Sequence, residues 1–144
     1  MVIQLFPDVA PAHCERFRQL ARENFYDGTP FHRVIEGFMA QGGDPTGTGT
    51  GGSKLPDLKA EFTNSRNFAR GTCGMARTGN PDSANSQFFI MFAPAPHLDG
   101  QYTIWGQVVS GMEFVDQIKR GSGGGGTVSD PERIVQFRVA ADVT

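Results

Sequence analysis

The chain has 144 residues, with 13 basic and 15 acidic side chains and a formal net charge of −2, so no basic surface points to nucleic acid or an anionic membrane. No apolar run approaches the length of a transmembrane helix, and the only two cysteines, Cys14 and Cys73, lie far apart. We therefore expect a soluble, cytoplasmic protein with free thiols, folded as one domain over residues 1–144. Nineteen Gly and nine Pro favour strands and loops over helices.

The first part of the chain predicts a strand, a helix and a hairpin. Alternating apolar side chains predict a strand at Val2–Phe6. Apolar residues at three-four spacing after Pro11 predict an amphipathic helix that ends near Asn24. Two further strands, Phe31–Ile35 and Phe38–Gln41, are joined by a tight turn, which makes them a hairpin.

The hairpin carries an arginine beside Phe, Met and Gln side chains. Arg33 cannot lose its charge, and its planar fork of donors can bind a carbonyl or carboxylate group. At the rim of an apolar patch, Arg33 would bind such a group of a ligand while the patch buries an apolar part of the same ligand. The alternative is that Arg33 pairs with a surface acid while Phe38 and Met39 fill the core.

The segment 42–56 is built almost entirely of small residues. Gly47, Gly49 and Gly52 satisfy the pattern G-x-G-x-x-G of dinucleotide-binding proteins. That motif needs a strand directly before it and a helix directly after, whereas Pro45 and Pro56 flank this segment. We therefore interpret it as a long surface loop.

The rest of the chain predicts four strands and a second helix. The helix, Met112–Lys119, would turn Phe114, Val115 and Ile118 inward. The strands are Gly71–Ala76, Gln87–Phe92, Ile104–Val109 (with Trp105 in the core) and Ile134–Val139. About seven strands with two helices and no strand-helix alternation indicate an antiparallel barrel or sandwich with helices at its ends.

The strand at 87–92 is apolar on both faces. Phe88, Ile90 and Phe92 can face the core, and Gln87, Phe89 and Met91 then point the other way. In α/β proteins helices cover such a second face, but this chain has too few helices for a full layer. We therefore expect this second face to bind something.

No arrangement for nucleophilic or metal chemistry stands out. His13, His32 and His97 lack ligand spacing, so no zinc site is predicted. A triad of Ser83, His97 and Asp99 is conceivable, but the chain has no G-x-S-x-G elbow. Apolar side chains with amide and guanidinium donors suit peptide binding, or a reaction that breaks no covalent bond.

Several motifs, in order along nearly the whole chain, resemble the cyclophilin family of peptidyl-prolyl cis-trans isomerases. They are Phe-His-Arg-Val-Ile (31–35), Gly-Phe-Met-Ala-Gln-Gly-Gly-Asp (37–44), Gly-Thr-Gly-Gly (49–52), Gly-Met-Ala (74–76), Asn-Ser-Gln-Phe-Phe-Ile (85–90) and His-Leu-Asp-Gly (97–100). The resemblance implies a mainly β fold, a closed eight-stranded antiparallel barrel capped by two helices, with the active site on the outer face. It implies a monomer that needs no cofactor or metal, acts on proline-containing peptides and unfolded proteins, and assists folding.

The resemblance also assigns roles to residues. Arg33 is the catalytic arginine, and the remaining positions fall into two groups. The proline pocket is Phe38, Met39, Phe89 and Leu98, and the groove for the substrate backbone is Gln41, Ala76, Arg77 and Gln87. His97 and Tyr102 complete the binding site at positions where many eukaryotic members carry Trp and His, and Arg77 stands where they often carry Asn. These differences resemble the bacterial branch and imply weak binding of cyclosporin.

Two further expectations follow from the resemblance. Family members have another strand before the one that begins here at Met1, so we expect Val2–Phe6 to lack one neighbour or to borrow one from another molecule. If the missing strand loosens the site, the protein would bind proline peptides without catalysis. The alternative function is therefore a non-catalytic proline-peptide binding module or chaperone.

Overall fold

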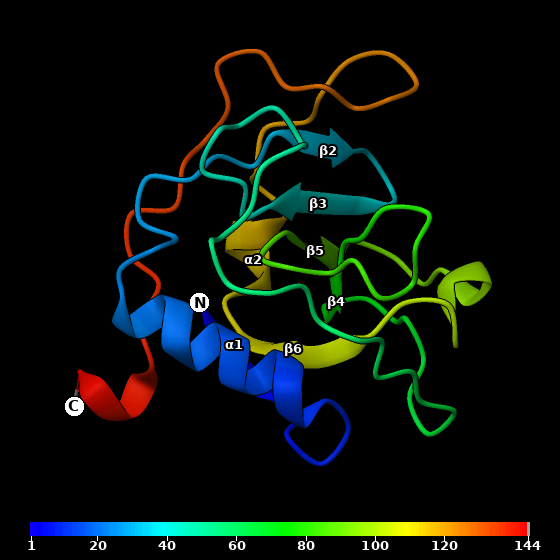
Figure 1. Ribbon diagram of the computed structural model, residues 1–144. Helices are drawn as coiled ribbons and strands as arrows, with labels where there is room; N and C mark the ends of the chain where they lie inside the picture. The colour runs from blue at the N-terminus through cyan, green and yellow to red at the C-terminus, as the bar shows by residue number, and fades with distance from the viewer. Residues whose placement is uncertain (144) are drawn as a thin grey trace.

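The computed structural model of the protein describes residues 1–143, and its strands form one six-stranded antiparallel sheet (Figure 1). The strand order is β1-β6-β4-β5-β3-β2. The strands are β1 (Val2–Leu5), β2 (Arg33–Ile35), β3 (Met39–Gly42), β4 (Thr72–Met75), β5 (Phe88–Met91) and β6 (Ile104–Ser110). The helices are α1 (Pro11–Arg22) and α2 (Met112–Val115), with single 3-10 turns η1 (Pro96–Leu98) and η2 (Ala140–Asp142). No helix within residues 1–143 is long and apolar enough to cross a membrane.

The mainly β antiparallel fold with two helices is confirmed, but closure of the barrel is not, because the sheet has two edge strands. At one edge β1 pairs only with β6, so within the described residues it lacks a second neighbour, as expected. At the other edge, β2 is covered by the chain at 120–128. The N–H of Val34 donates to the carbonyl of Gly126 at 2.8 Å, and the N–H of Gly121 donates to the carbonyl of Val34 at 2.8 Å.

The two faces of β5 carry two separate apolar clusters, as predicted from its sequence. Phe88 and Ile90 belong to the main core, whereas Phe89 and Met91 belong to a second cluster on the opposite face. Helix α1 lies beside β6 and helps to cover the main core (Figure 1). There the fully buried Trp105 stacks on Phe17, with ring centroids 3.7 Å apart. The second cluster therefore stays available for a binding site.

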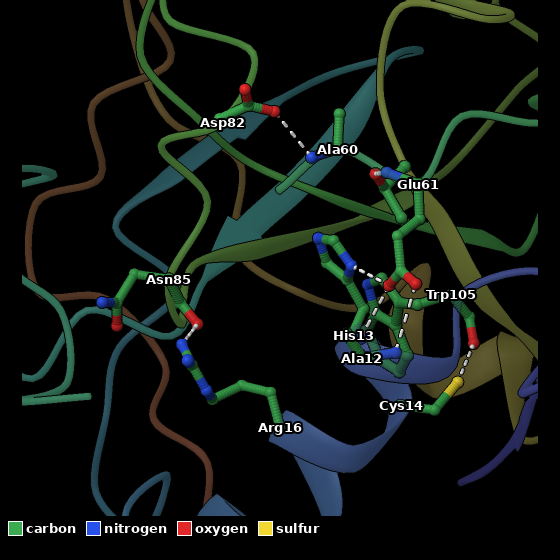
Figure 2. A network of polar contacts seen from close by, with 10 residues as sticks. Ala12, His13, Cys14, Arg16, Ala60, Glu61, Asp82, Asn85 and Trp105 are labelled. Carbon is green, nitrogen blue, oxygen red and sulfur yellow. Dashed lines mark hydrogen bonds and ion pairs between the residues drawn. The ribbon is translucent and has the colours of Figure 1, made fainter. Parts of the chain in front are cut away.

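The N-terminus of α1 is held by a carboxylate from a distant loop (Figure 2). Glu61 accepts hydrogen bonds from the backbone N–H groups of Ala12 at 3.2 Å and His13 at 2.9 Å, and its Oε1 lies 2.5 Å from His13 Nδ1. A negative charge here satisfies the first N–H groups of the helix and interacts favourably with its dipole. His13 is fully buried, and this burial lowers the pKa of its imidazole, although the Glu61 hydrogen bond acts in the opposite direction.

The predicted strand at Ile134–Val139 is wrong. Ile134 exchanges two hydrogen bonds with the turn at 28–29, through the N–H of Gly28 at 2.7 Å and the carbonyl of Thr29 at 2.9 Å. Beyond it, residues 135–139 run without strand structure. Phe137 packs against Tyr26, with ring centroids 4.7 Å apart, whereas Val135, which would share its face in a strand, is 85% exposed. Ile134 and Phe137, three residues apart, both pack on the main core, which is not the alternation of a strand, and a strand also needs a neighbouring backbone to pair with.

The predicted second helix is also too long, because α2 ends at Val115 rather than Lys119. After it the chain continues in a single tight turn, in which the N–H of Ile118 donates to the carbonyl of Val115 at 3.1 Å. Val115 and Ile118 are buried as predicted, whereas Phe114 is 58% exposed. One helical turn presents only a narrow face to the core, so Phe114 lies outside it.

Candidate active site

A row of residues on four adjacent strands defines the site. Arg33 on β2 lies opposite Gln41 on β3, Gln41 lies opposite Phe89 on β5, and Phe89 lies opposite Gly74 on β4. Residues directly opposite each other in an antiparallel sheet project to the same face. The guanidinium of Arg33 and the ring of Phe89 therefore stand on one face, with the Gln41 amide between them. Met39, two residues from Gln41, shares this face.

The guanidinium of Arg33 is exposed and oriented by two neutral oxygens. Its Nε donates to the carbonyl of Gly125 at 3.1 Å, and its Nη1 donates to Oε1 of Gln41 at 3.1 Å. Its Nη2 has no hydrogen-bond partner, and no ion pair involves Arg33, among residues 1–143. The alternative in which Arg33 pairs with a surface acid is therefore wrong, and a charged donor remains free to bind a ligand.

The second apolar cluster forms the floor of the candidate site, beside the Arg33 guanidinium. Met39, Phe89 and Leu98 are buried, and Phe38 packs against them from the edge of the cluster. The ring of Phe89 is stacked on Phe68 at 5.7 Å. The structure thus brings the four predicted pocket residues, which come from β3, the turn before it, β5 and η1, into one cluster on the face of Arg33.

Tyr102 and His97 extend the cluster at its rim. The Tyr102 ring meets the Phe89 ring edge-on, with centroids 5.8 Å apart, and the centroids of the His97 and Phe38 rings lie 5.9 Å apart. Arg77 lies over the Tyr102 ring at 4.5 Å and donates to the carbonyl of Gln101 through Nη2 at 2.7 Å. These contacts place every predicted binding residue of the rim next to the pocket residues.

A polar groove of about 480 Å³ adjoins the apolar cluster. Three predicted groove residues, Ala76, Arg77 and Gln87, line it together with the glycine loop at 49–52. The N–H of Ala76 donates to the carbonyl of Gln87 at 3.0 Å, which joins the two walls. The predicted surface loop at 42–56 therefore contributes to the site, which the sequence reasoning missed.

Sequence reasoning also missed Phe68 and the carbonyl of Gly125. Phe68 supports the Phe89 ring from a segment without strand structure, and Gly125 contacts Arg33 only through its backbone. Periodicity cannot identify either, because one lies outside any repeat and the other acts through a group that every residue has. The turn-rich segment near residue 125 was the only available signal.

The conceivable Ser83, His97 and Asp99 triad does not form. Ser83 Oγ bonds within its own loop, to the carbonyl of Asn80 at 2.7 Å, and Asp99 Oδ1 accepts from the N–H of Phe68 at 2.7 Å. No group of three or more His, Cys, Asp or Glu side chains suited to a metal occurs within residues 1–143. The arrangement is therefore a guanidinium donor beside an apolar pocket and a polar groove.

Comparisons with known proteins agree with this geometry. The family model for cyclophilin type peptidyl-prolyl cis-trans isomerase/CLD matches residues 1–139. A probable peptidyl-prolyl cis-trans isomerase of Brucella suis is 51% identical over 154 residues, covering 99% of this chain and 78% of that protein. Peptidyl-prolyl cis-trans isomerase B of Bacillus subtilis is 46% identical over 119 residues, covering 82% of each.

A solved structure shows the same architecture. The cyclophilin type isomerase of Cryptosporidium parvum, crystallised in the presence of the dipeptide Ala-Pro, superposes with a TM-score of 0.84 at 32% identity. The match covers 93% of this chain and 88% of that one. The chain belongs to the cyclophilin family of peptidyl-prolyl cis-trans isomerases.

Proposed function

We propose that this peptidyl-prolyl cis-trans isomerase uses Arg33 as its catalytic residue and seats the proline ring on the pocket of Phe38, Met39, Phe89 and Leu98. The observation that carries this assignment is the free Nη2 of an exposed guanidinium in the same cross-strand row as Phe89. A charged donor next to an apolar seat fits an X-Pro unit, whose amide is polar and whose ring is not.

The chemistry follows from the amide bond. Rotation about the C–N bond meets a barrier of ~18–20 kcal/mol, because twisting removes its resonance. In the twisted state the nitrogen becomes pyramidal, and its lone pair becomes a hydrogen-bond acceptor. A donor from Arg33 aimed at that nitrogen strengthens only as the bond twists, so it stabilises the transition state more than the planar substrate. Neither the seating nor the rotation requires a cofactor.

The groove gives the substrate backbone its direction. Gln41, hydrogen-bonded to Arg33 and Gln87, forms one wall with Gln87, and Ala76 and Arg77 form the neighbouring wall. The Cryptosporidium relative crystallised with Ala-Pro supports Ala-Pro peptides as substrates of this chain. We assign it, as one domain over residues 1–144, to assisting the folding of cytoplasmic proteins as a monomer. The altered rim at His97 and Tyr102 favours weak binding of cyclosporin.

Replacement of the arginine tests this assignment. Arg33→Ala should lower kcat/KM on an Ala-Pro peptide by roughly 100- to 1,000-fold, as removal of an electrostatic donor does in other enzymes. Its stability should change by less than about 0.5 kcal/mol, because the side chain is exposed. Arg22→Ala is the matched control, since this exposed arginine pairs with Asp142 outside the site. Turnover of Arg33→Ala close to wild type would refute the assignment.

The second candidate, a non-catalytic proline-peptide binding module, gives a different result in the same measurements. It predicts that the wild-type chain binds an Ala-Pro peptide without accelerating its isomerisation. The coupled assay, combined with peptide titration, distinguishes the two. The free donor on Arg33 favours the enzyme, since binding the ring alone would not require it.

A further inference from the structure

One buried carboxylate organises the glycine loop that borders the site. Asp44 is fully buried, and its Oδ1 accepts hydrogen bonds from the N–H of Thr46 at 2.8 Å and from Thr46 Oγ1 at 2.7 Å. Its Oδ2 accepts from the N–H groups of Gly49 at 2.7 Å and Gly51 at 3.0 Å. Burial alone would raise the pKa of this carboxyl group, but these hydrogen bonds outweigh burial and lower the pKa to about 2. Asp44 is therefore ionised at neutral pH and holds the loop at three positions, Thr46, Gly49 and Gly51.

The loop fixed in this way holds the amide of Gln87. Both hydrogens of Gln87 Nε2 are used, one toward the carbonyl of Gly49 at 3.0 Å and one toward that of Gly51 at 2.9 Å. Rotating the amide by half a turn would place its oxygen against two carbonyl oxygens. The two loop carbonyls therefore determine which way the Gln87 side chain points.

This direction is passed on to Gln41 and then to Arg33. Oε1 of Gln87 accepts from Nε2 of Gln41 at 3.0 Å, so Oε1 of Gln41 must face the other way. There it accepts from Nη1 of Arg33 at 3.1 Å. A reversed Gln41 would present its NH₂ group to the guanidinium, which has only donors. The side-chain amides of Gln87 and Gln41 thus each have one favourable orientation.

We propose that Asp44 is a positioning residue for Arg33, acting through the glycine loop, Gln87 and Gln41. The proposal rests on the assignment of Arg33 as the catalytic residue. Asp44 orients the guanidinium without touching the substrate, and the loop must keep its close approach to the carboxylate. Consistent with this need, a Cβ atom at Gly51 would lie 2.2 Å from Asp44 Oδ1, so any larger residue would displace the loop.

The direct test is Asp44→Asn, which keeps the shape of the side chain but replaces one acceptor oxygen by an NH₂ group. We expect kcat on an Ala-Pro peptide to fall by about tenfold, equivalent to ~1.4 kcal/mol, while KM changes by less than about twofold. Asp82→Asn is the matched control, because this exposed carboxylate accepts from the N–H of Ala60 in another loop. It should keep wild-type kcat.

A double-mutant cycle separates positioning from a general structural effect. In an Arg33→Ala background, Asp44→Asn should cause no further loss of kcat, since there is no guanidinium left to position. If Asp44→Asn fails to fold, Thr46→Val replaces it in the cycle, because it removes one of the hydrogen bonds to the carboxylate, together with the contacts of the exposed Thr46 hydroxyl with Thr48. We expect Thr46→Val to lower kcat by roughly two- to threefold, equivalent to less than ~1 kcal/mol.

The outcomes also distinguish this proposal from the assignment on which it rests. Wild-type kcat in folded Asp44→Asn, a rise in KM alone, or an equal loss of kcat with and without Arg33 would each overturn the positioning role. If Arg33→Ala itself keeps wild-type turnover, the catalytic assignment fails instead. Loss of kcat in both single variants, with no additional loss in the double variant, supports both.

Discussion

Gly74 faces the Phe89 ring and offers a sharp test of the pocket. An added Cβ atom there would lie 2.4 Å from Phe89 Cζ and 2.6 Å from Phe68 Cε1, where carbon atoms ordinarily stay about 3.5 Å apart. The two rings are stacked on each other, and Tyr102 closes the edge of Phe89, so neither ring can move away freely. Gly74→Ala should therefore displace the ring that forms the proline seat, by roughly 1 Å.

This displacement sets the expected magnitudes. Overpacking a well-filled core costs about 1–3 kcal/mol, which lowers Tm by roughly 3–12 °C in a chain of this size. A 1 Å shift of a binding surface can cost up to roughly 100-fold in rate, so we expect kcat/KM on an Ala-Pro peptide to fall about 10- to 100-fold. Urea unfolding and the coupled isomerisation assay measure the two effects.

The matched control is Gly79→Ala, because an added Cβ atom at Gly79 would meet nothing within 4 Å. Its stability and turnover should remain those of wild type. Backbone strain does not explain a loss at Gly74, since neither glycine adopts a positive φ. If Gly74→Ala matches wild type in both stability and kcat/KM, the Phe89 ring is not held as described, and the assignment of the proline seat is wrong.

Three further predictions address the pocket, its rim and its support. Phe89→Ala should weaken Ala-Pro peptide binding as well as turnover, with a loss of about 3–5 kcal/mol in stability; unchanged affinity, measured by titration, would place the proline ring elsewhere. Arg77→Ala should raise KM severalfold with little change in kcat, because Arg77 shapes the rim by lying over Tyr102 and makes no described contact with Arg33; a selective loss of kcat would contradict this role. Burial lowers the pKa of His13, so the unfolded chain binds a proton that the folded chain does not, and the free energy of unfolding should decrease as pH falls below ~6.5. Urea unfolding at pH 7.5 and 5.5 should show a smaller decrease for His13→Gln than for wild type, and an equal decrease would exclude His13 as a cause.

Local pattern predicted the parts of the site that depend on neighbours in sequence. The hairpin turn sets the register that places Arg33 opposite Gln41, and the two-faced apolar pattern of β5 sets Phe89 apart from the core. The motifs then supplied the roles. The hydrogen bonds from Gln41 to Gln87 and from Arg33 to Gly125 join segments 46 and 92 residues apart, so they depend on which strands and loops become neighbours. No periodicity carries that information.

The errors have the same physical origin. Apolar residues at Ile134–Val139 predicted a strand, and Ile134 and Phe137 do pack on the core, but the segment alone could not show that a strand partner would be lacking. The apolar spacing after Met112 likewise identified Val115 and Ile118 as buried and overestimated the helix. Burial is encoded in one segment, whereas hydrogen-bond pairing and helix length depend on what the rest of the chain places beside it.

Among residues 1–143 one edge of β1 is unpaired, and this edge bears on which function the site supports. A cavity of about 860 Å³ lies along that edge, and β5 contributes Phe88 and Ile90 to its lining, the residues that face away from Phe89 and the site. Arg33, in contrast, lies on β2, which is held on one side by β3 and on the other by the chain at 120–128. The cavity therefore borders the main core, on the face opposite the catalytic row. A loosened site was the reason to consider a binding module without activity, and these contacts remove that reason: the open edge should lower the stability of the fold, while the orientation of the Arg33 guanidinium depends on contacts that it does not reach.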